Sequence, residues 1–203
     1  MAHFWTNVYK TKALEAVSWY SAKLPVSLGL MRTLCPSHKA HIIDGDAGRS
    51  TLVDQLLDEQ YENVTLFDIS KEAIQQTKQR LENKASKITA LIGDITNYSF
   101  GSQKFDLWHD RAVFHFLTTP DGRQSYKSAL CEALKPGACF IIATFGPNGP
   151  VKCSNCDTVR YSDASLSDEF GDDFKMLGST IVDHDTPFKT KQQFIYCWFR
   201  YQP

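Results

Sequence analysis

Short apolar runs alternate along the chain with segments whose apolar residues recur at helical spacing. Runs of about four to eight apolar residues are typical of strands, whereas apolar residues three or four positions apart indicate one buried face of a helix. The runs predict strands over residues 41–44, 63–68, 88–92, 105–108, 138–145, 174–182 and 192–201. The spacing predicts helices that begin near Ser50, after a Ser70 cap, and at Thr119–Pro120.

The order of these elements predicts a sheet that is mostly parallel. Strands that alternate with helices require right-handed crossover connections, which place helices on both faces of the sheet. The run over 138–145 is continuously apolar, as expected for a strand that is buried on both faces. The connection between the last two strands is short, which permits an antiparallel pair. The expected fold is therefore α/β and Rossmann-like, with a C-terminal antiparallel hairpin at one edge.

The first 36 residues form a separate pattern, which is predicted to be helical and carries Trp5, Tyr9, Trp19 and Tyr20. These four rings either form a lid over a ligand or pack against the rest of the protein, as aromatic side chains on helices commonly do. No linker divides the chain into two halves. We therefore expect a single domain over 1–203, with an N-terminal helical lid over 1–36 and a Rossmann-like core over 37–203.

The composition narrows the classes of partner. The formal net charge is −1 and 22% of the residues are charged, so no overall positive charge attracts nucleic acid or an anionic membrane. No apolar run approaches the roughly 20 residues that span a bilayer. The N-terminus lacks a basic segment followed by an apolar one, and the six cysteines lie mostly within apolar runs. These features predict reduced thiols and a cytoplasmic protein.

The stretch from His41 to Ser50 carries the strongest chemical signal. Gly45 and Gly48 allow backbone angles and close approaches that a side chain forbids, and the helix expected near Ser50 directs free N–H groups at the turn. Asp44 ends the strand. A carboxylate would repel the pyrophosphate of a dinucleotide, whose loop also needs a different glycine spacing. It favours a cofactor with a cationic end, such as the ammonium and sulfonium groups of S-adenosylmethionine.

Two further acidic residues, Asp68 and Asp94, follow the next two strands. Ligands of a parallel sheet bind at the carboxyl ends of its strands, where both residues would lie in register with Asp44. Asp68 is placed to accept hydrogen bonds from the two ribose hydroxyls. Asp94 is placed to accept one from an adenine amino group, with Ile69 and Ile95 on the faces of the ring. Helix capping or a turn explains each aspartate singly, but it explains three in register less well.

Several stretches resemble the class I S-adenosylmethionine-dependent methyltransferases, and within them the citrate synthase lysine methyltransferase subgroup and its bacterial relatives. The longest is Trp108-His109-Asp110-Arg111-Ala112-Val113-Phe114-His115-Phe116, and the others are residues 17–20, 149–150, 153–154, 160–162, 184, 186–187 and 193–194. The resemblance covers essentially the whole chain. It implies a seven-stranded sheet, S-adenosylmethionine as the methyl donor and a protein lysine as the acceptor.

The chain departs from this family at Asp46. The family has a glycine there, the first glycine of its acidic-x-Gly-x-Gly loop. The side chain of Asp46 would either crowd the methionine end of the cofactor or add a second carboxylate beside Asp44. This departure makes a catalytically silent binding module with the same fold an alternative function.

Methyl transfer is an in-line displacement that needs alignment and exclusion of water, and a lysine acceptor must also lose a proton. Asp110 is the first candidate for a catalytic residue, expected near the transferred methyl group, where it would orient the acceptor or the amino group of the cofactor. His109 is the second candidate. His184, which precedes the last strand, either borders the acceptor pocket or belongs to a turn.

Arg111 is expected at the cofactor site as well. It either pairs with an acidic group of a ligand or forms a structural ion pair with Asp44 or Asp106. Cys153 and Cys156 are spaced like half of a zinc site, but a structural zinc needs four ligands and no second pair is visible. A loop with two thiols is therefore favoured over a redox-active pair, and no metal site is predicted.

The methyl acceptor has two interpretations. The resemblance favours a protein lysine, and a small amine, thiol or oxyanion is the alternative. Nicotinamide-dependent redox chemistry is disfavoured because the phosphate-binding loop is missing. Modification of nucleic acid is disfavoured because the chain has neither a basic patch nor an Asn-Pro-Pro-Tyr type motif. The sequence predicts no membrane partner and leaves the oligomeric state open.

Overall fold

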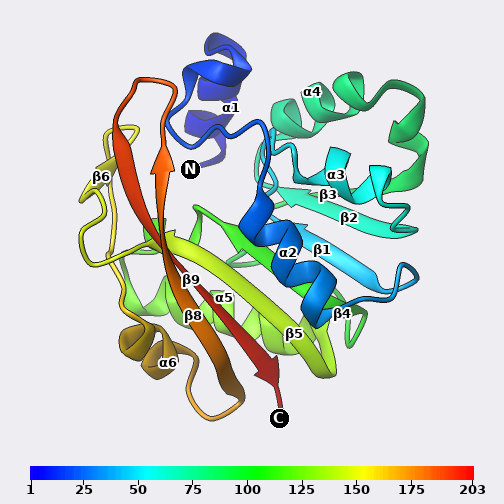
Figure 1. Cartoon of the computed structure of the whole chain (residues 1–203), viewed down its shortest axis with the longest axis vertical. Helices are drawn as coiled ribbons and strands as arrows, with labels where there is room; N and C mark the ends of the chain where they lie inside the picture. The colour runs from blue at the N-terminus through cyan, green and yellow to red at the C-terminus, as the bar shows by residue number, and fades with distance from the viewer.

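The computed structural model describes residues 1–203, and its centre is one seven-stranded sheet. The strands follow the order β3-β2-β1-β4-β5-β9-β8 (Figure 1). The parallel strands are β1 (His41–Gly45), β2 (Asn63–Asp68), β3 (Ile88–Ile92), β4 (Phe105–Arg111) and β5 (Leu134–Phe145). The antiparallel strands are β8 (Phe174–Asp185) and β9 (Lys191–Tyr201), and β9 pairs with β5. The predicted parallel sheet with a C-terminal antiparallel hairpin is confirmed.

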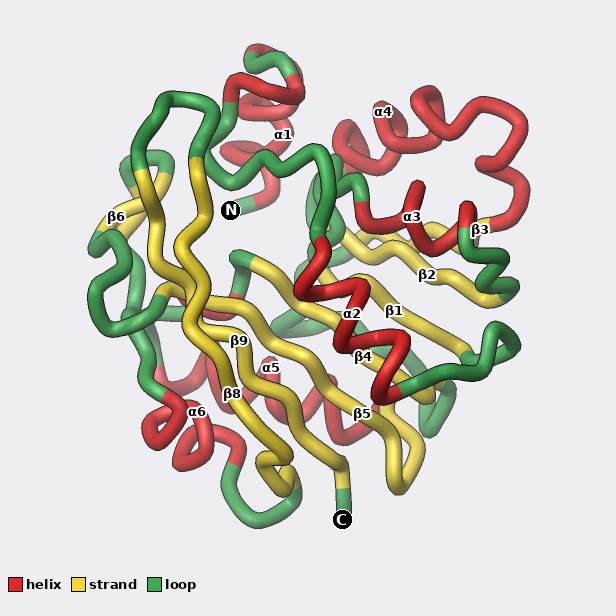
Figure 2. Tube along the Cα trace, in the orientation of Figure 1, coloured by secondary structure: helices red, strands yellow, loops and turns green.

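Helices cover both faces of this sheet (Figures 1 and 2). They are α1 (Ala2–Thr11), α2 (Pro25–Leu34), α3 (Leu52–Asp58), α4 (Lys71–Leu81), α5 (Pro120–Ala133) and α6 (Asp163–Phe170). One hydrophobic cluster includes side chains of α2, α3 and α4, and a second includes side chains of α5 and α6. Successive strand residues point to opposite faces, so β1 contributes Ile42 to the first cluster and Ile43 to the second.

The two predicted helix starts at Ser70 and Thr119 are present. The Ser70 hydroxyl accepts a hydrogen bond from the N–H of Ala73, and the Thr119 hydroxyl accepts one from the N–H of Gly122. Each bond satisfies a backbone donor that the first turn of a helix leaves free. These caps fix where α4 and α5 begin, and so fix the loops that follow β2 and β4.

The strand β4 is longer than the sequence predicts. It continues through Arg111 instead of ending at Trp108, because residues 109–111 pair with β5 and, in part, with β1. His109 and Asp110 therefore lie on a strand and not on the loop after it. Their side chains alternate between the two faces of the sheet, which decides the geometry of the site.

The N-terminal region is divided differently from the expected lid over 1–36. The helix α2 packs on the sheet, and its Leu28 and Met31 belong to the first hydrophobic cluster. The residues before it include α1 and a short 3-10 helix (Leu14–Ala16), and α1 packs against α4. The sequence also does not predict α6 or the small hairpin of β6 (Lys152–Cys153) and β7 (Cys156–Asp157). No helix has both the length and the apolar character required to cross a bilayer.

Candidate active site

A cavity of about 500 Å³ lies at the carboxyl ends of β1, β2 and β4, the place where open parallel sheets bind ligands. Residues 1–24, which we call the N-terminal segment, form one wall through Met1, Trp5, Tyr9, Leu14, Val17, Trp19, Tyr20, Ser21 and Leu24. Of the predicted site residues, those on the cavity wall are Asp44, Asp46, Gly48, Ser50, Asp68, Ile69, Asp94, Ile95, His109 and Arg111. Gly45, Asp110 and His184 are not on this wall.

Asp44 is buried at the end of β1 and is fixed by His109 of β4. Its Oδ1 lies 2.6 Å from Nδ1 of His109, whose Nε2 lies 2.9 Å from Oγ of Ser27 in α2. A carboxylate only accepts hydrogen bonds, so His109 donates from Nδ1. Ser27 is fully buried, so this chain of groups orients Asp44 and does not expose a serine nucleophile. Oδ2 of Asp44 is buried at the cavity without a hydrogen-bond partner.

Asp68 ends β2 and organises the loop that follows β1. Its Oδ2 accepts a hydrogen bond from the N–H of Gly48 at 2.7 Å, and its Oδ1 accepts one from the N–H of Ser70 at 2.6 Å. Burial raises the pKa of Asp68 to about 7, the two N–H groups lower it, and Asp44 raises it further. Each carboxylate oxygen has a second lone pair, so Asp68 keeps the capacity to accept from a ligand hydroxyl.

Asp46 adopts the backbone conformation that a glycine would supply. Its φ is +61°, in the left-handed region where aspartate is one of the tolerated residues. Burial raises the pKa of Asp46 well above its usual range, and the charges of Asp68, Asp110 and Asp94 raise it further. The departure from the family therefore leaves the loop intact and adds a carboxyl group to the cavity wall.

Asp94 stabilises a turn and also lines the cavity. Its Oδ1 accepts hydrogen bonds from the N–H of Thr96 at 3.0 Å and from the hydroxyl of Thr96 at 2.7 Å. The turn interpretation thus applies to one oxygen of Asp94. Ile69 and Ile95 also line the cavity, which provides apolar surface next to this carboxyl group.

Gly45 and Asp110 face away from the cavity, contrary to expectation. A Cβ on Gly45 would lie 2.7 Å from Nε1 of Trp108, so this glycine makes room for a buried indole. Asp110 is fully buried, and its Oδ2 accepts a hydrogen bond from the hydroxyl of Tyr126 in α5 at 2.6 Å. Burial raises the pKa of Asp110 to about 7. The alternation along β4 turns His109 toward α2 and Asp110 toward α5.

Arg111 reaches the cavity and has no carboxylate partner. Its Nε donates to the hydroxyl of Tyr196 at 3.2 Å, and its Nη1 donates to the carbonyl of Trp19 at 3.0 Å. The alternative of a structural ion pair with Asp44 or Asp106 is wrong, because both aspartates pair with other residues. Arg111 is therefore a cationic group on the cavity wall at the end of β4, without an acidic partner.

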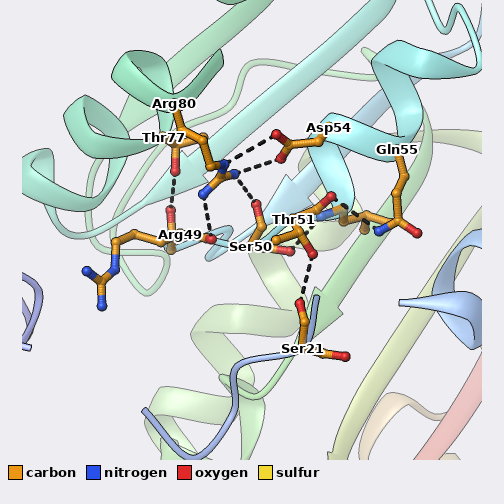
Figure 3. Close-up of polar contacts among 10 residues, drawn as sticks. Ser21, Arg49, Ser50, Thr51, Asp54, Gln55, Thr77 and Arg80 are labelled. Atoms are coloured by element: carbon orange, nitrogen blue, oxygen red, sulfur yellow. Dashed lines mark hydrogen bonds and ion pairs between the residues drawn. The ribbon is translucent and has the colours of Figure 1, made fainter. Parts of the chain in front are cut away.

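Side chains of the loop after β1 hold the N-terminal segment over the cavity. Nη1 and Nη2 of Arg49 donate to the carbonyls of Lys12 at 2.9 Å and Ala13 at 3.1 Å. The hydroxyl of Thr51 donates to the carbonyl of Ser21 at 2.9 Å (Figure 3). Arg49 and Thr51 flank Ser50, so the loop that faces the cavity also carries the attachment points of the segment that covers it.

The backbone of the same loop is fixed from α4. Arg80 donates to the carbonyls of Arg49 at 3.0 Å and Ser50 at 2.7 Å, and it forms an ion pair with Asp54 of α3 (Figure 3). The helix α3 begins at Leu52, two residues later than expected. The carbonyls of Arg49 and Ser50 are thus held by a cation on a neighbouring helix.

His184 lies on β8 and outside the cavity wall. Its Nε2 donates to the carbonyl of Ser18 at 2.8 Å, and burial lowers the pKa of His184. The residue therefore matches neither the pocket interpretation nor the turn interpretation. It attaches the N-terminal segment to the C-terminal hairpin, on the side opposite to Arg49.

The four aromatic residues of the N-terminal segment, Trp5, Tyr9, Trp19 and Tyr20, all line the cavity. The ring of Trp5 packs edge-on against Trp19 at 5.8 Å and against Phe116 at 5.2 Å, measured between ring centroids. The packing interpretation therefore applies to Trp5, and a lid over a ligand stays a prediction. The four rings together give the cavity wall aromatic surface.

Sequence reasoning missed the residues that act through long-range contacts. Ser27 and His109 are 82 positions apart, and no local pattern indicates that they meet. Arg49 lies within the stretch from His41 to Ser50 and Thr51 directly follows it, but the sequence does not indicate their partners in the N-terminal segment. Arg80 carried no signal beyond a basic residue in the last turn of a helix.

Comparisons with known proteins bear on the family and the fold. A family model described as a methyltransferase domain matches residues 36–202. The eEF1A lysine and N-terminal methyltransferases of Bos taurus and Mus musculus are 25% identical over 118 residues and 26% identical over 120 residues. These alignments cover 58% and 59% of this chain and 17% of each relative. The chain thus spans about a sixth of the length of these curated relatives.

Two solved structures are similar over the whole chain. One, reported for the conversion of a disulfide bond into a thioacetal group during echinomycin biosynthesis, has a TM-score of 0.81 at 18% identity and is covered over 93% of its length. The other is the 1,6-didemethyltoxoflavin-N1-methyltransferase of Burkholderia thailandensis with bound 1,6-didemethyltoxoflavin and S-adenosylhomocysteine. Its TM-score is 0.71 at 20% identity, and 84% of it is covered. At these identities, the likeness shows the shared fold.

Proposed function

The chain belongs to the methyltransferase domain family, and from this premise we propose that its cavity transfers a methyl group to a small molecule that is enclosed beneath the N-terminal segment. The family model supports the predicted class of enzyme, and the similar structure with bound S-adenosylhomocysteine supports S-adenosylmethionine as the donor. The acceptor and the role of each residue are proposals. The observation that carries them is the cavity itself, whose wall combines acidic strand ends with aromatic side chains of the N-terminal segment.

The residues on the acidic side fit a cationic donor. Oδ2 of Asp44 is a buried oxygen without a partner, and a buried polar atom is costly until a hydrogen-bond donor reaches it. Asp46 and Asp68 crowd the same wall, where their pKa values are raised by burial. A bound cation would relieve this crowding. Ile69 and Ile95 add apolar surface of the kind that packs on a purine ring.

The donor supplies an activated methyl group on a sulfonium when it is bound. We propose that Asp44 and Asp46 face its cationic end and that Asp68 and Asp94 accept hydrogen bonds from its nucleoside. His109 acts as a positioning residue, because its Nδ1 holds Asp44 and its Nε2 is engaged by Ser27. The predicted catalytic roles of Asp110 and His184 are not carried forward, since neither side chain lines the cavity.

Enclosure supports a small acceptor. The N-terminal segment is attached to the loop after β1 by Arg49 and Thr51, to β4 by Arg111 and to β8 by His184. A segment held at four places excludes water from the reacting atoms, which methyl transfer requires. It also restricts access for the side chain of a folded protein. Arg111 and the aromatic rings next to it are suited to an acceptor that is planar or carries an oxyanion.

The test is to incubate the purified chain with a cell lysate and S-adenosylmethionine labelled on its methyl group. We expect label in the small-molecule fraction and none on protein bands. Asp68→Asn, which weakens the donor site, serves as the background control. Label confined to protein bands contradicts the small acceptor, and label in neither fraction, together with tight donor binding, indicates the silent binding module.

A protein lysine is the second candidate acceptor. It is favoured by the similarity to the eEF1A lysine and N-terminal methyltransferases, which covers 58% of this chain for the Bos taurus protein. A carboxyl group with a raised pKa, such as that of Asp46 at the cavity wall, is suited to accept the proton that a lysine must lose. The labelling experiment separates the two candidates directly.

A further inference from the structure

Cys153 and Cys156 occupy directly opposite positions of a two-residue hairpin. The strands β6 and β7 are antiparallel, and their register pairs Cys153 with Cys156. The turn residues Ser154 and Asn155 have φ values of +50° and +64°, as a type I′ turn requires at both central positions. Lys152 and Asp157, the next pair, form an ion pair at 3.0 Å. Turn and register together fix how the two cysteines face each other.

This arrangement satisfies the requirements of a disulfide bond. Opposite residues of an antiparallel pair point to the same face, and their Cα atoms lie about 4.5 to 5.5 Å apart. A disulfide bridges Cα atoms that are about 4.4 to 6.8 Å apart. The Cβ atoms of such a pair lie at or just beyond the usual range for a disulfide, a strain that makes the bond easier to reduce.

We propose that Cys153 and Cys156 form a reversible disulfide and that the hairpin of β6 and β7 is an oxidation site at the edge of the cavity. The proposal is independent of the acceptor and of the donor. It favours a redox-active pair of cysteines over a loop with two inert thiols. The structure holds the pair as free thiols, which is the reduced state of this site.

The oxidant in this reaction is glutathione disulfide. Cys156, the more exposed of the two, loses its proton and attacks one sulfur of the oxidant, so that the S–S bond breaks and one glutathione leaves as the thiol. Cys153 then loses its proton and attacks Sγ of Cys156, which displaces the second glutathione. Two electrons pass from the two cysteines to the oxidant. The products are one protein disulfide and two reduced glutathiones.

The site is connected to the N-terminal segment through Cys153. This residue lines the cavity and is 6% exposed. Burial raises the pKa of the Cys153 thiol, and the neighbouring side chains of Ser18 and Ser154 lower it. Val17 and Trp19, on either side of Ser18, line the same cavity as Cys153. Formation of the disulfide turns Sγ of Cys153 toward Cys156 and so changes the wall on which this part of the segment lies, and oxidation is therefore expected to loosen it.

The full chain is incubated with excess oxidised glutathione, the remaining thiols are alkylated, and peptides are mapped by mass spectrometry. We expect an intramolecular Cys153–Cys156 disulfide that reduced glutathione reverses. Cys153→Ser should stop at a mixed disulfide of glutathione on Cys156, and Cys131→Ser should behave like the unchanged protein. Cys35 and Cys139, both buried, serve as internal controls that are alkylated only after unfolding.

Three outcomes would overturn the proposal. One is that Cys153 and Cys156 both stay alkylatable under the oxidant. Another is that the unchanged protein stops at the mixed disulfide on Cys156, which means that the two sulfurs cannot meet. The last concerns the link to the cavity: we expect backbone hydrogen exchange over residues 14–21 to rise severalfold on oxidation, and equal exchange in both states contradicts that link.

Discussion

The two sides of the cavity are built in different ways. On the acidic side, Asp44 and Asp68 lie at the ends of β1 and β2, and Asp94 follows β3. Their places depend on short-range patterns and on the parallel order of these three strands. On the aromatic side, the contacts join distant parts of the chain. Arg111 meets Trp19 across 92 positions. The donor can therefore be inferred from the sequence, whereas the acceptor depends on contacts that only the folded protein reveals.

Loss of Asp68 should remove most of the donor affinity. Asp68→Asn replaces a charged acceptor that also orders the loop through the N–H of Gly48, and hydrogen bonds to charged groups contribute about 1.5 to 3 kcal/mol each. We expect S-adenosylmethionine to bind roughly 100-fold more weakly by calorimetry. Asp58→Asn, at an exposed ion pair with Lys84, is the matched control and should bind normally. Equal affinity in both variants would mean that the acidic side does not hold the donor.

The pH dependence of donor binding follows from the pKa of Asp68, which burial raises to about 7. A cationic donor favours the ionised carboxylate, so binding below pH 7 must release a proton. We expect the affinity for S-adenosylmethionine to fall about tenfold from pH 8 to pH 6. Calorimetry in buffers of different ionisation enthalpy measures the released proton. An affinity that is constant, or that rises toward pH 6, has the wrong sign for this explanation.

Release of the N-terminal segment tests the aromatic side. Arg49→Met removes the part-buried hydrogen bonds to the carbonyls of Lys12 and Ala13, which contribute about 0.5 kcal/mol each, the low end of the usual range. We expect protease cleavage within residues 10–24 to become roughly fivefold faster. Arg32→Met, at an exposed ion pair with Glu59, removes a matched cation elsewhere. If the two variants are cut equally fast, the loop after β1 does not hold the segment closed.

Substitution of Asp46 is expected to have the smallest effect, which is a change in thermal stability. Asp46→Gly relieves both a positive φ and the crowding of carboxyl groups, and a gain of about 1 kcal/mol raises the midpoint of thermal unfolding by about 2 to 4 °C. The raised pKa of Asp46 costs stability as the pH rises above the value of an unfolded aspartate, so the gain should grow from pH 4 to pH 7. Lys189→Gly changes an exposed residue with φ of +60° and relieves backbone strain alone. Equal gains would remove the electrostatic explanation.

The sequence predicts the fold well because apolar runs and caps are local signals. The seven strands, the caps at Ser70 and Thr119 and the antiparallel hairpin all follow from such patterns. The candidate site is predicted only where it depends on strand ends. Asp110 was misplaced because the length of β4 decides which face each residue takes, and that length depends on pairing with β5.

The crystal structure of the full chain with S-adenosylhomocysteine tests the central claim most directly. We predict the ribose hydroxyls within hydrogen-bond distance of Asp68, the amino acid end beside Asp44, and the N-terminal segment closed above the nucleoside through Arg49. A nucleoside bound elsewhere, or Asp44 and Asp68 satisfied only by the protein groups that they contact now, would contradict the claim that this cavity is the methyl-transfer site.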